Sequence, residues 1–251
     1  MATPRHRLTF VLSIFLVAGF VGAASAQTPD EVVEKHLAAL GGREALGKLT
    51  SRKSTGKVSV TNDAGTIPGS VEIYAKAPNK SRVNIKLDLS AMGAGDMVID
   101  QRFDGTAGYM LNSMQGDSEI TGNQLENMRN STFPSPLLNY KEAGTRIEVL
   151  PKEKLGDKEA LVLLITPKAG SVVRMFLDPE TYLIVRTVAK INSPQMGGDI
   201  EQTIDLSDYR PVDNVKVAFH VVNSNPMQSL SISFDKIEHN VPIDDAMFVK
   251  K

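Results

Sequence analysis

The sequence contains no cysteine and no tryptophan, and aromatic residues make up only 6% of its 251 residues. Without cysteine the chain has no disulfide, no thiolate nucleophile, no thiolate metal ligand and no site for lipid attachment through sulfur. The scarcity of aromatic rings disfavours a polysaccharide cleft, because such clefts usually present aromatic platforms to sugars. An exported protein of this kind must be held together by core burial and strand pairing.

An excess of charge of one sign is also missing, since 28 Lys and Arg stand against 29 Asp and Glu. No basic stripe follows any predicted face, so we expect no nucleic-acid partner. A long apolar run is absent beyond the first 26 residues, and no later stretch is suited to cross a membrane.

The first 26 residues have the organisation of a cleavable secretory signal. Arg5 and Arg7 precede the apolar run "LTFVLSIFLVAGFVGAA", and Ala24-Ser25-Ala26 provides the small-x-small pattern at its end. We therefore expect cleavage after Ala26, export to the periplasm, and one domain covering residues 27–251.

Two-residue alternation dominates the chain from about residue 51 onward. In "YAKAPNKSRVNIKLDLS" (74–90) Val83, Ile85, Leu87 and Leu89 point one way while polar residues point the other, as in a half-buried antiparallel strand. Similar stretches follow with short Gly, Pro, Asp and Asn connectors, which favours an up-and-down antiparallel sheet. About 10–11 strands in one sheet should curl strongly into an open or nearly closed barrel.

Helical signals occur at two places. Thr28-Pro29-Asp30-Glu31 predicts a capped helix over residues 29–40, ended by Gly41-Gly42. Residues 122–141 break the strand rhythm with "GNQLENMRN" and "PSPLLNYK", which predict a helical insertion over the sheet.

Several local patterns resemble the periplasmic outer-membrane lipoprotein carrier and sorting proteins, the LolA/LolB-like family. They lie in order along the chain and are "ALGGREALGKLTS" (39–51), "YAKAPNK" (74–80), "FDG" (103–105), "LDPETYLIVR" (177–186), "YRPVD" (209–213) and "HNVPIDDAMF" (239–248).

The resemblance implies a mainly β fold in which one strongly curved antiparallel sheet, an unclosed barrel, carries the N-terminal helix and the insertion on its concave face. It also implies a periplasmic carrier, expected to be monomeric, that binds lipoprotein acyl chains or other lipid-like hydrophobes, with envelope membrane proteins as loading and release partners. In the best-known carriers a basic residue precedes the Pro-Asn of the strand end, whereas this chain has Ala77. That departure places lipoprotein transfer in question and leaves lipid binding as the expectation.

Hydropathy indicates which side chains would form such a site. The expected cavity wall consists of Val71, Ile73, Val83, Ile85, Leu87, Met97, Ile99, Met110 and Leu111. The expected lid consists of Val33, Leu37, Leu40, Leu125, Met128, Leu137 and Leu138. We expect loose lid packing, with hinges at Gly122 and Pro134, because a lid that packs too tightly would prevent uptake.

Methionines gather near the insertion, where five of the ten fall within residues 92–128, namely Met92, Met97, Met110, Met114 and Met128. Such a group suits an adaptable ligand wall, and it suits gap filling in a core equally well.

Catalytic and metal motifs are not evident. His36, His220 and His239 lack metal-site spacing, so structural or solvent-facing roles are expected for them. Ser54-Thr55-Gly56-Lys57 matches Ser-x-x-Lys but starts a predicted strand, where the helix and partner motifs of penicillin-recognising enzymes are lacking. Asp244-Asp245 is typical of solvated turn acids. We therefore expect a non-enzymatic protein without metal or cofactor; the alternative function is an interaction or scaffold module of a cell-envelope complex, with its interior filled by its own side chains.

Overall fold

The computed structural model describes residues 27–193 and 198–250, so the expected signal at 1–26 lies outside the described residues. Within them, one antiparallel sheet has the strand order β6-β5-β4-β3-β2-β1-β13-β12-β11-β10-β9-β8-β7. Its strands are β1 (Ser51–Asn62), β2 (Gly65–Lys76), β3 (Lys80–Leu87), β4 (Met97–Phe103), β5 (Gly108–Asn112), β6 (Ser118–Ile120), β7 (Arg146–Leu155), β8 (Lys158–Thr166), β9 (Val173–Leu177), β10 (Ile184–Ser193), β11 (Gly198–Val212), β12 (Val215–Asn225) and β13 (Gln228–His239). The helical elements are α1 (Pro29–Leu40), α2 (Arg43–Gly47), α3 (Gly122–Asn130) and two 3₁₀ turns, η1 (Ser90–Met92) and η3 (Asp245–Met247).

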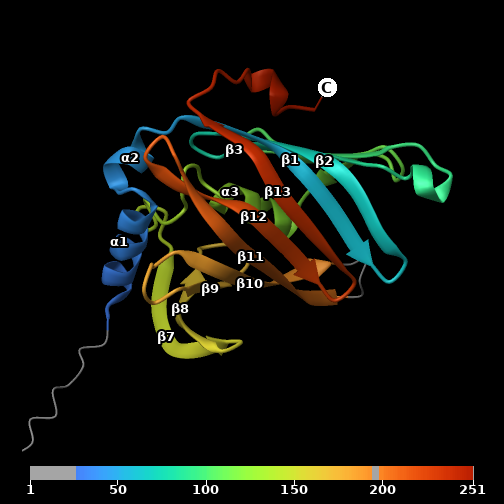
Figure 1. The fold of residues 1–251 in the computed structure, drawn as a ribbon. Coiled ribbons are helices and arrows are strands. Elements are labelled where there is room, and N and C mark those ends of the chain that lie inside the picture. The colour runs from blue at the N-terminus through green and yellow to red at the C-terminus, as the bar shows by residue number, and fades with distance from the viewer. Residues whose placement is uncertain (1–26, 194–197, 251) are drawn as a thin grey trace, which may run out of the picture.

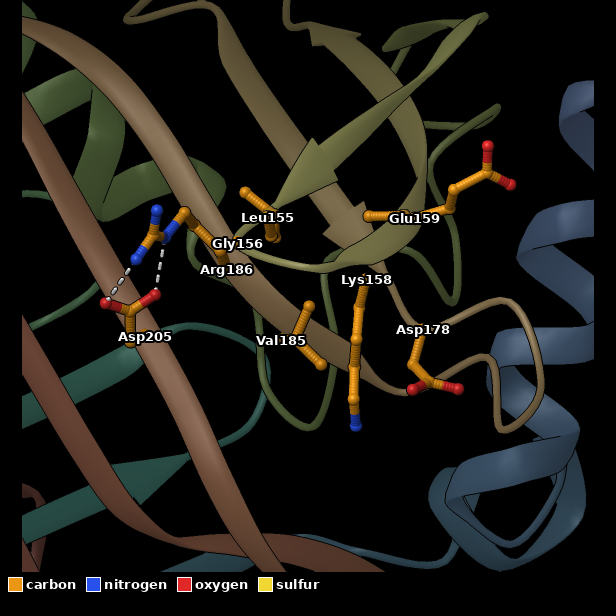
Figure 2. A pocket seen from close by; sticks show the side chains of 9 residues that line it. Leu155, Gly156, Lys158, Glu159, Asp178, Val185, Arg186 and Asp205 are labelled. Atoms are coloured by element: carbon orange, nitrogen blue, oxygen red, sulfur yellow. Dashed lines mark hydrogen bonds and ion pairs between the residues drawn. The ribbon is translucent and has the colours of Figure 1, made fainter.

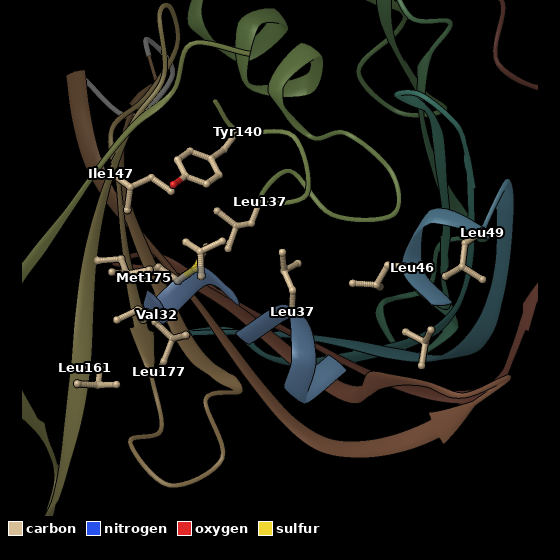
Figure 3. Packing of buried hydrophobic residues seen from close by; sticks show 13 residues of the cluster. Val32, Leu37, Leu46, Leu49, Leu137, Tyr140, Ile147, Leu161, Met175 and Leu177 are labelled. Carbon is tan, nitrogen blue, oxygen red and sulfur yellow. The ribbon is translucent and has the colours of Figure 1, made fainter. Parts of the chain in front are cut away.

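The sheet curves around the helices without closing, which confirms the expected half-barrel (Figures 1 and 3). The described residues contain thirteen strands, so the expected count of 10–11 is too low. One reason is β6, whose three residues are too short to show a two-residue period.

Chain topology explains why a segment must lie inside the curve. The first and last strands, β1 and β13, pair in the middle of the sheet, which leaves β6 and β7 at its two edges. Residues 121–145 connect these edges, and we call them the crossing segment. Because β6 and β7 are consecutive in the chain but lie at opposite edges of the sheet, this segment has to pass from one edge, or rim, of the half-barrel to the other.

Helix α1 forms as the sequence predicts. The hydroxyl of Thr28 accepts the Glu31 N–H at 3.3 Å, and the Glu31 carboxylate accepts the Thr28 N–H at 2.8 Å, so both partners of a capping box are present. Gly41 ends the helix at φ 128°, and a Cβ there would lie 2.3 Å from the Asn214 carbonyl oxygen. Only glycine permits this turn, which seats α1 and α2 against the β11–β12 turn.

The crossing segment is helical in its first part only. Its residues Gly122–Asn130 form α3, as predicted, whereas the second predicted helical stretch, "PSPLLNYK", consists of turns. Pro134 and Pro136 lack the N–H groups that would join a helix. Leu137 and Tyr140 are buried in the main core, so packing of the segment decides its path.

Three apolar clusters hold the sheet. The largest lies under α1, where Val32, Val33 and Leu37 pack on strand residues such as Leu163 and Leu177 (Figure 3). A second cluster gathers side chains of β1–β4 and β13 around Val58, Val71 and Ile85 on the concave face. A third lies on the convex face of β8–β10.

Candidate functional site

A cavity of about 250 Å³ lies on the concave face, between α1–α2, the crossing segment and strands β1, β2 and β10–β13. Its apolar wall includes Leu46, Leu49, Ile73, Val221, Phe234 and Ile237. The volume is just under the ~300 Å³ at which ligand pockets for small molecules usually begin.

The helices form part of this wall through a few residues. Leu46 of α2 and Leu49, which follows it, face the cavity from one side while Leu40 does so from the end of α1. Figure 3 shows Leu46 and Leu49 to one side of Val32 and Leu37, within the same buried cluster. The turn at Gly41 therefore lets α1 and α2 contribute to one cluster while α2 also borders the cavity.

Two polar side chains lie side by side on the wall of this cavity. Arg52 of β1 is the direct partner of His239 of β13, and both line the hollow. The Nε of Arg52 and both ring nitrogens of His239 are buried without a hydrogen-bond partner. The guanidinium of Arg52 lies 5.6 Å from the centre of the Phe133 ring, which covers it from the crossing segment.

Burial shifts the acid–base properties of these groups. It lowers the pKa of Arg52 from its usual value. It also lowers the pKa of His239, and the nearby charge of Arg52 adds to this, against an opposing contribution from Asp213. His239 Nδ1 lies 3.5 Å from the exposed Asp213 carboxylate, which is too long for a strong hydrogen bond. His239 is therefore expected to be neutral at pH 7, while Arg52 stays charged.

The other two histidines make ordinary structural contacts, as expected. His36 is buried, and its Nδ1 donates to the Tyr182 carbonyl at 2.8 Å. His220 Nδ1 and the Ser233 hydroxyl are 3.1 Å apart on neighbouring strands. His36 and His239 both line the cavity, but only His239 has two buried ring nitrogens without a hydrogen-bond partner.

Most of the expected wall residues lie on the concave face but outside this cavity. Strand pairing places all but one of them on a single face, and seven belong to or pack against the second cluster, namely Val71, Ile73, Val83, Ile85, Leu87, Met97 and Ile99. Of these, Ile73 alone also lines the cavity. Their role in ligand binding stays a prediction.

Leu111 cannot belong to that wall. It is the partner of Asp100, while its neighbour Met110 is the partner of Gln101. Side chains alternate along a strand, so Leu111 faces the convex side and Met110 faces the concave side. Adjacent strand residues could not both have lined one wall.

The expected lid divides into two parts. Val33, Leu37 and Leu137 are buried in the main core, and Leu40 and Leu138 pack against it. Leu125 and Met128 of α3 lie instead over Gly108 of β5, within 3.4 Å of the position a Cβ would take there. Helix α1 thus covers β7–β9 and β12, and not the wall on β2–β4 that hydropathy had suggested.

Helix α3 braces the two rims of the half-barrel. On one side Arg129 donates to the Thr106 carbonyl at 3.0 Å, in the β4–β5 turn. On the other side Asn127 donates to the Ser171 hydroxyl at 3.0 Å and accepts the Ser171 N–H at 2.8 Å. These contacts connect strands that are far apart in the sheet order.

The methionine group does not form one wall. Met92 and Met114 are 57% and 62% exposed in loops at the end of the sheet, whereas Met97, Met110 and Met128 are partly buried. The adaptable methionine wall is therefore not assembled as a continuous surface.

A second hollow, of about 390 Å³, lies on the convex face beside the β7–β8 turn (Figure 2). Its charged groups are largely engaged with each other or with the backbone. Arg186 donates to both carboxylate oxygens of Asp205, at 2.6 and 2.9 Å, and Asp178 accepts the N–H groups of Glu180 and Thr181. This self-paired polar depression is a poor match for a hydrophobic ligand.

Metal and membrane features are absent from the described part of the chain. Residues 27–193 and 198–250 contain no cluster of three or more His, Asp or Glu side chains arranged to bind a metal. No helix among them has the length and apolar character needed to span a bilayer.

Comparison with known proteins identifies the fold. No family model and no curated protein matches the sequence. Among solved structures, an outer membrane lipoprotein-sorting protein domain from Vibrio parahaemolyticus is similar at TM-score 0.57 and 12% identity, over 87% of this chain and 94% of that one. A LolA superfamily protein from Nitrosomonas europaea is similar at TM-score 0.56 and 13% identity, over 90% and 99%. A DUF1329 family protein from Desulfovibrio piger is similar at TM-score 0.58 and 12% identity, over 89% and 98%. The expected resemblance is confirmed for the fold, which is LolA-like.

Arg52 is the main site residue that sequence reasoning missed. It stands in phase with Ser54, Gly56, Val58 and Val60 on the alternating strand β1, so its parity already placed an arginine on the apolar face. The run "SRKSTGK" is polar throughout, which hid that parity until strand pairing showed it.

Proposed function

We propose that the protein is a non-enzymatic periplasmic carrier that binds acyl chains or similar hydrophobes on the concave face of its half-barrel. The observation that carries this proposal is the mainly apolar cavity between α1–α2, the crossing segment and the central strands. The LolA-like fold and the signal-like first 26 residues support it.

Hydrophobic burial supplies a free energy comparable with the cost of binding. Each methylene removed from water contributes about 0.8 kcal/mol, so a chain of about a dozen carbons gains roughly 10 kcal/mol at full burial. Association itself costs an estimated 4–15 kcal/mol. Uptake is therefore feasible only when opening the cavity disturbs little of the existing core.

Helix α1 does not meet that condition as a movable lid. Its residues Val32, Val33 and Leu37 are fully buried. Truncating a single buried leucine to alanine already costs about 2–5 kcal/mol of stability, so displacing the whole helix would cost more. We therefore assign α1 as a fixed wall. The part of the crossing segment around Phe133–Pro136 is the better gate, because it borders the cavity and has only Ser135 buried.

A matched pair of substitutions on β12 tests the carrier proposal. Val221 lines the cavity, and Val222, the next residue, faces the convex side opposite Ser231. Val221→Phe should weaken displacement of a fluorescent fatty acid at least about tenfold, equal to about 1.4 kcal/mol, because the ring occupies ligand space. Val222→Phe should leave affinity unchanged.

Equal binding by both variants would place the ligand elsewhere. Mass spectrometry of protein purified gently from its native envelope provides the second test, with co-purified lipid as the expected result. A lipid-free protein that binds no fatty acid and retains a stoichiometric protein partner would contradict the carrier proposal and favour an envelope scaffold.

A further inference from the structure

Arg52, whose Nε is buried, differs from Arg82 and Arg102 in having no acidic partner. Arg82 and Arg102 each pair with Asp100 at 2.7 Å on the convex face. Among the described residues no carboxylate forms an ion pair with Arg52. A buried charge is costly unless it is paired and hydrogen-bonded, so an arginine left in this state is available to a partner from outside the chain.

The surroundings of Arg52 suit an anion. Its direct cross-strand partner, His239, has two unpartnered ring nitrogens, and the neutral ring always carries one N–H donor. Cross-strand partners have Cβ atoms about 5 Å apart, so one ligand group can contact both. The nearest acid, Asp213, is 66% exposed, and its carboxylate lies 3.5 Å from His239 Nδ1.

Apolar surface continues from this point along the strands. The partners of β1 and β13 run from Arg52 and His239, through Ser54 and Ile237, to Gly56 and Phe234. Beyond them lies the second cluster around Val58. The polar pair thus stands at one end of a hydrophobic track.

We propose that Arg52, assisted by His239, binds the anionic headgroup, a carboxylate or phosphate, of a single-chain amphiphile whose hydrocarbon lies along this track. This proposal rests on the carrier function and names its ligand class. The guanidinium gives paired N–H donors that match both anions, and the Phe133 ring covers its face.

The test compares headgroups on one chain length. Dodecanoate, dodecyl phosphate, dodecanol and inorganic phosphate are titrated calorimetrically into the wild type and into Arg52→Met, Arg52→Lys and Arg146→Met. Arg146 is 72% exposed on β7 and serves as the matched control for loss of one arginine.

The wild type should bind dodecanoate or dodecyl phosphate at least about tenfold more tightly than dodecanol. Arg52→Met should abolish this preference and leave dodecanol binding within about twofold, whereas Arg52→Lys should retain part of the preference and Arg146→Met all of it. The two anions, compared with each other, show whether a carboxylate or a phosphate lipid is favoured.

Each other outcome overturns the proposal in a distinct way. Equal affinity for dodecanol and both anions removes the headgroup site and leaves the carrier function standing. Tight binding of inorganic phosphate alone points to a free anion site, without a chain. Failure of all three dodecyl compounds overturns both proposals. Circular dichroism verifies folding of Arg52→Met, and if that variant does not fold, the wild-type preference and Arg52→Lys decide.

Discussion

The hydroxyl of Tyr140 donates a short hydrogen bond to the carboxylate of Asp30, which ties the end of the crossing segment to the first turn of α1. Lys141 pairs with the other carboxylate oxygen at 2.5 Å. The pKa of Tyr140 is raised to about 12, mainly by burial and secondly by the hydrogen bond to Asp30. The second half of the crossing segment is therefore fastened to α1, so the gate that we propose is limited to the part before it, around Phe133–Pro136.

Loosening this attachment should ease ligand entry. Tyr140→Phe removes the hydrogen bond and keeps the ring in the core, so we expect a small loss of stability and faster uptake of a fluorescent fatty acid in stopped-flow measurements. Leu137→Ala, which creates a cavity in the same core, should cost about 2–5 kcal/mol in urea unfolding. Unchanged uptake by Tyr140→Phe would show that this contact does not limit opening.

Acid should destabilise the protein through Asp100. Burial alone would raise the pKa of Asp100, but hydrogen bonds from Arg82 and Arg102 outweigh it and hold the pKa below its usual value. The network therefore stabilises the fold above about pH 3.9, and this contribution disappears as the pH falls below that value.

Asp100→Asn should cost about 3–5 kcal/mol at pH 7, because two arginines with little exposure lose their anion. Urea unfolding between pH 5 and pH 2.5 checks the linkage. The variant should lose less stability over this range than the wild type does, and parallel curves would refute the assignment.

A second pH effect should begin near pH 6.5. Burial lowers the pKa of His36, and this effect outweighs the hydrogen bond to the Tyr182 carbonyl, which raises it. The pKa of His239 is lowered by burial and, in addition, by the nearby positive charge of Arg52. The unfolded chain then binds more protons than the folded one as the pH falls below about 6.5, so stability should decrease by up to about 1.4 kcal/mol per pH unit for each histidine.

Denaturant unfolding from pH 7.5 to pH 5 measures this slope. His36→Gln retains a side-chain N–H donor and cannot titrate, so its curve should be shallower than that of the wild type. A variant with the wild-type slope would show that His36 titrates normally in the folded protein.

The pairing of β1 with β13 should depend on Gly56. The register of the two strands shifts between Thr55 and Gly56, and a Cβ at Gly56 would lie 2.3 Å from the Ser233 carbonyl oxygen. Gly56→Ala should therefore cost about 1–3 kcal/mol in thermal unfolding, since backbone must move.

The control is Gly47→Ala in α2, where the added methyl meets nothing within 4 Å. That change should be neutral, or stabilising by up to about 1 kcal/mol. Equal effects of the two substitutions would mean that the strands at Gly56 are not closely constrained.

Local patterns were enough to predict much of this fold. The capping residues Thr28 and Glu31 define the start of α1, because a cap requires only residues within one turn. Alternation in residues 80–87 identifies β3 and its apolar face, because a strand's period of two is visible over a few residues.

The sequence by itself thus determined most element types, the alternating faces and the curved antiparallel sheet, since these depend on short-range stereochemistry and short connections. Tertiary structure alone decided that α1 covers β7–β9, that residues 134–141 are not helical, and that Arg52 lies beside His239 on a cavity wall. Those features arise where β1 meets β13 and where the crossing segment passes between the rims, which brings together residues nearly 190 positions apart. No periodicity within a strand or helix contains that information, because it depends on which strands become neighbours.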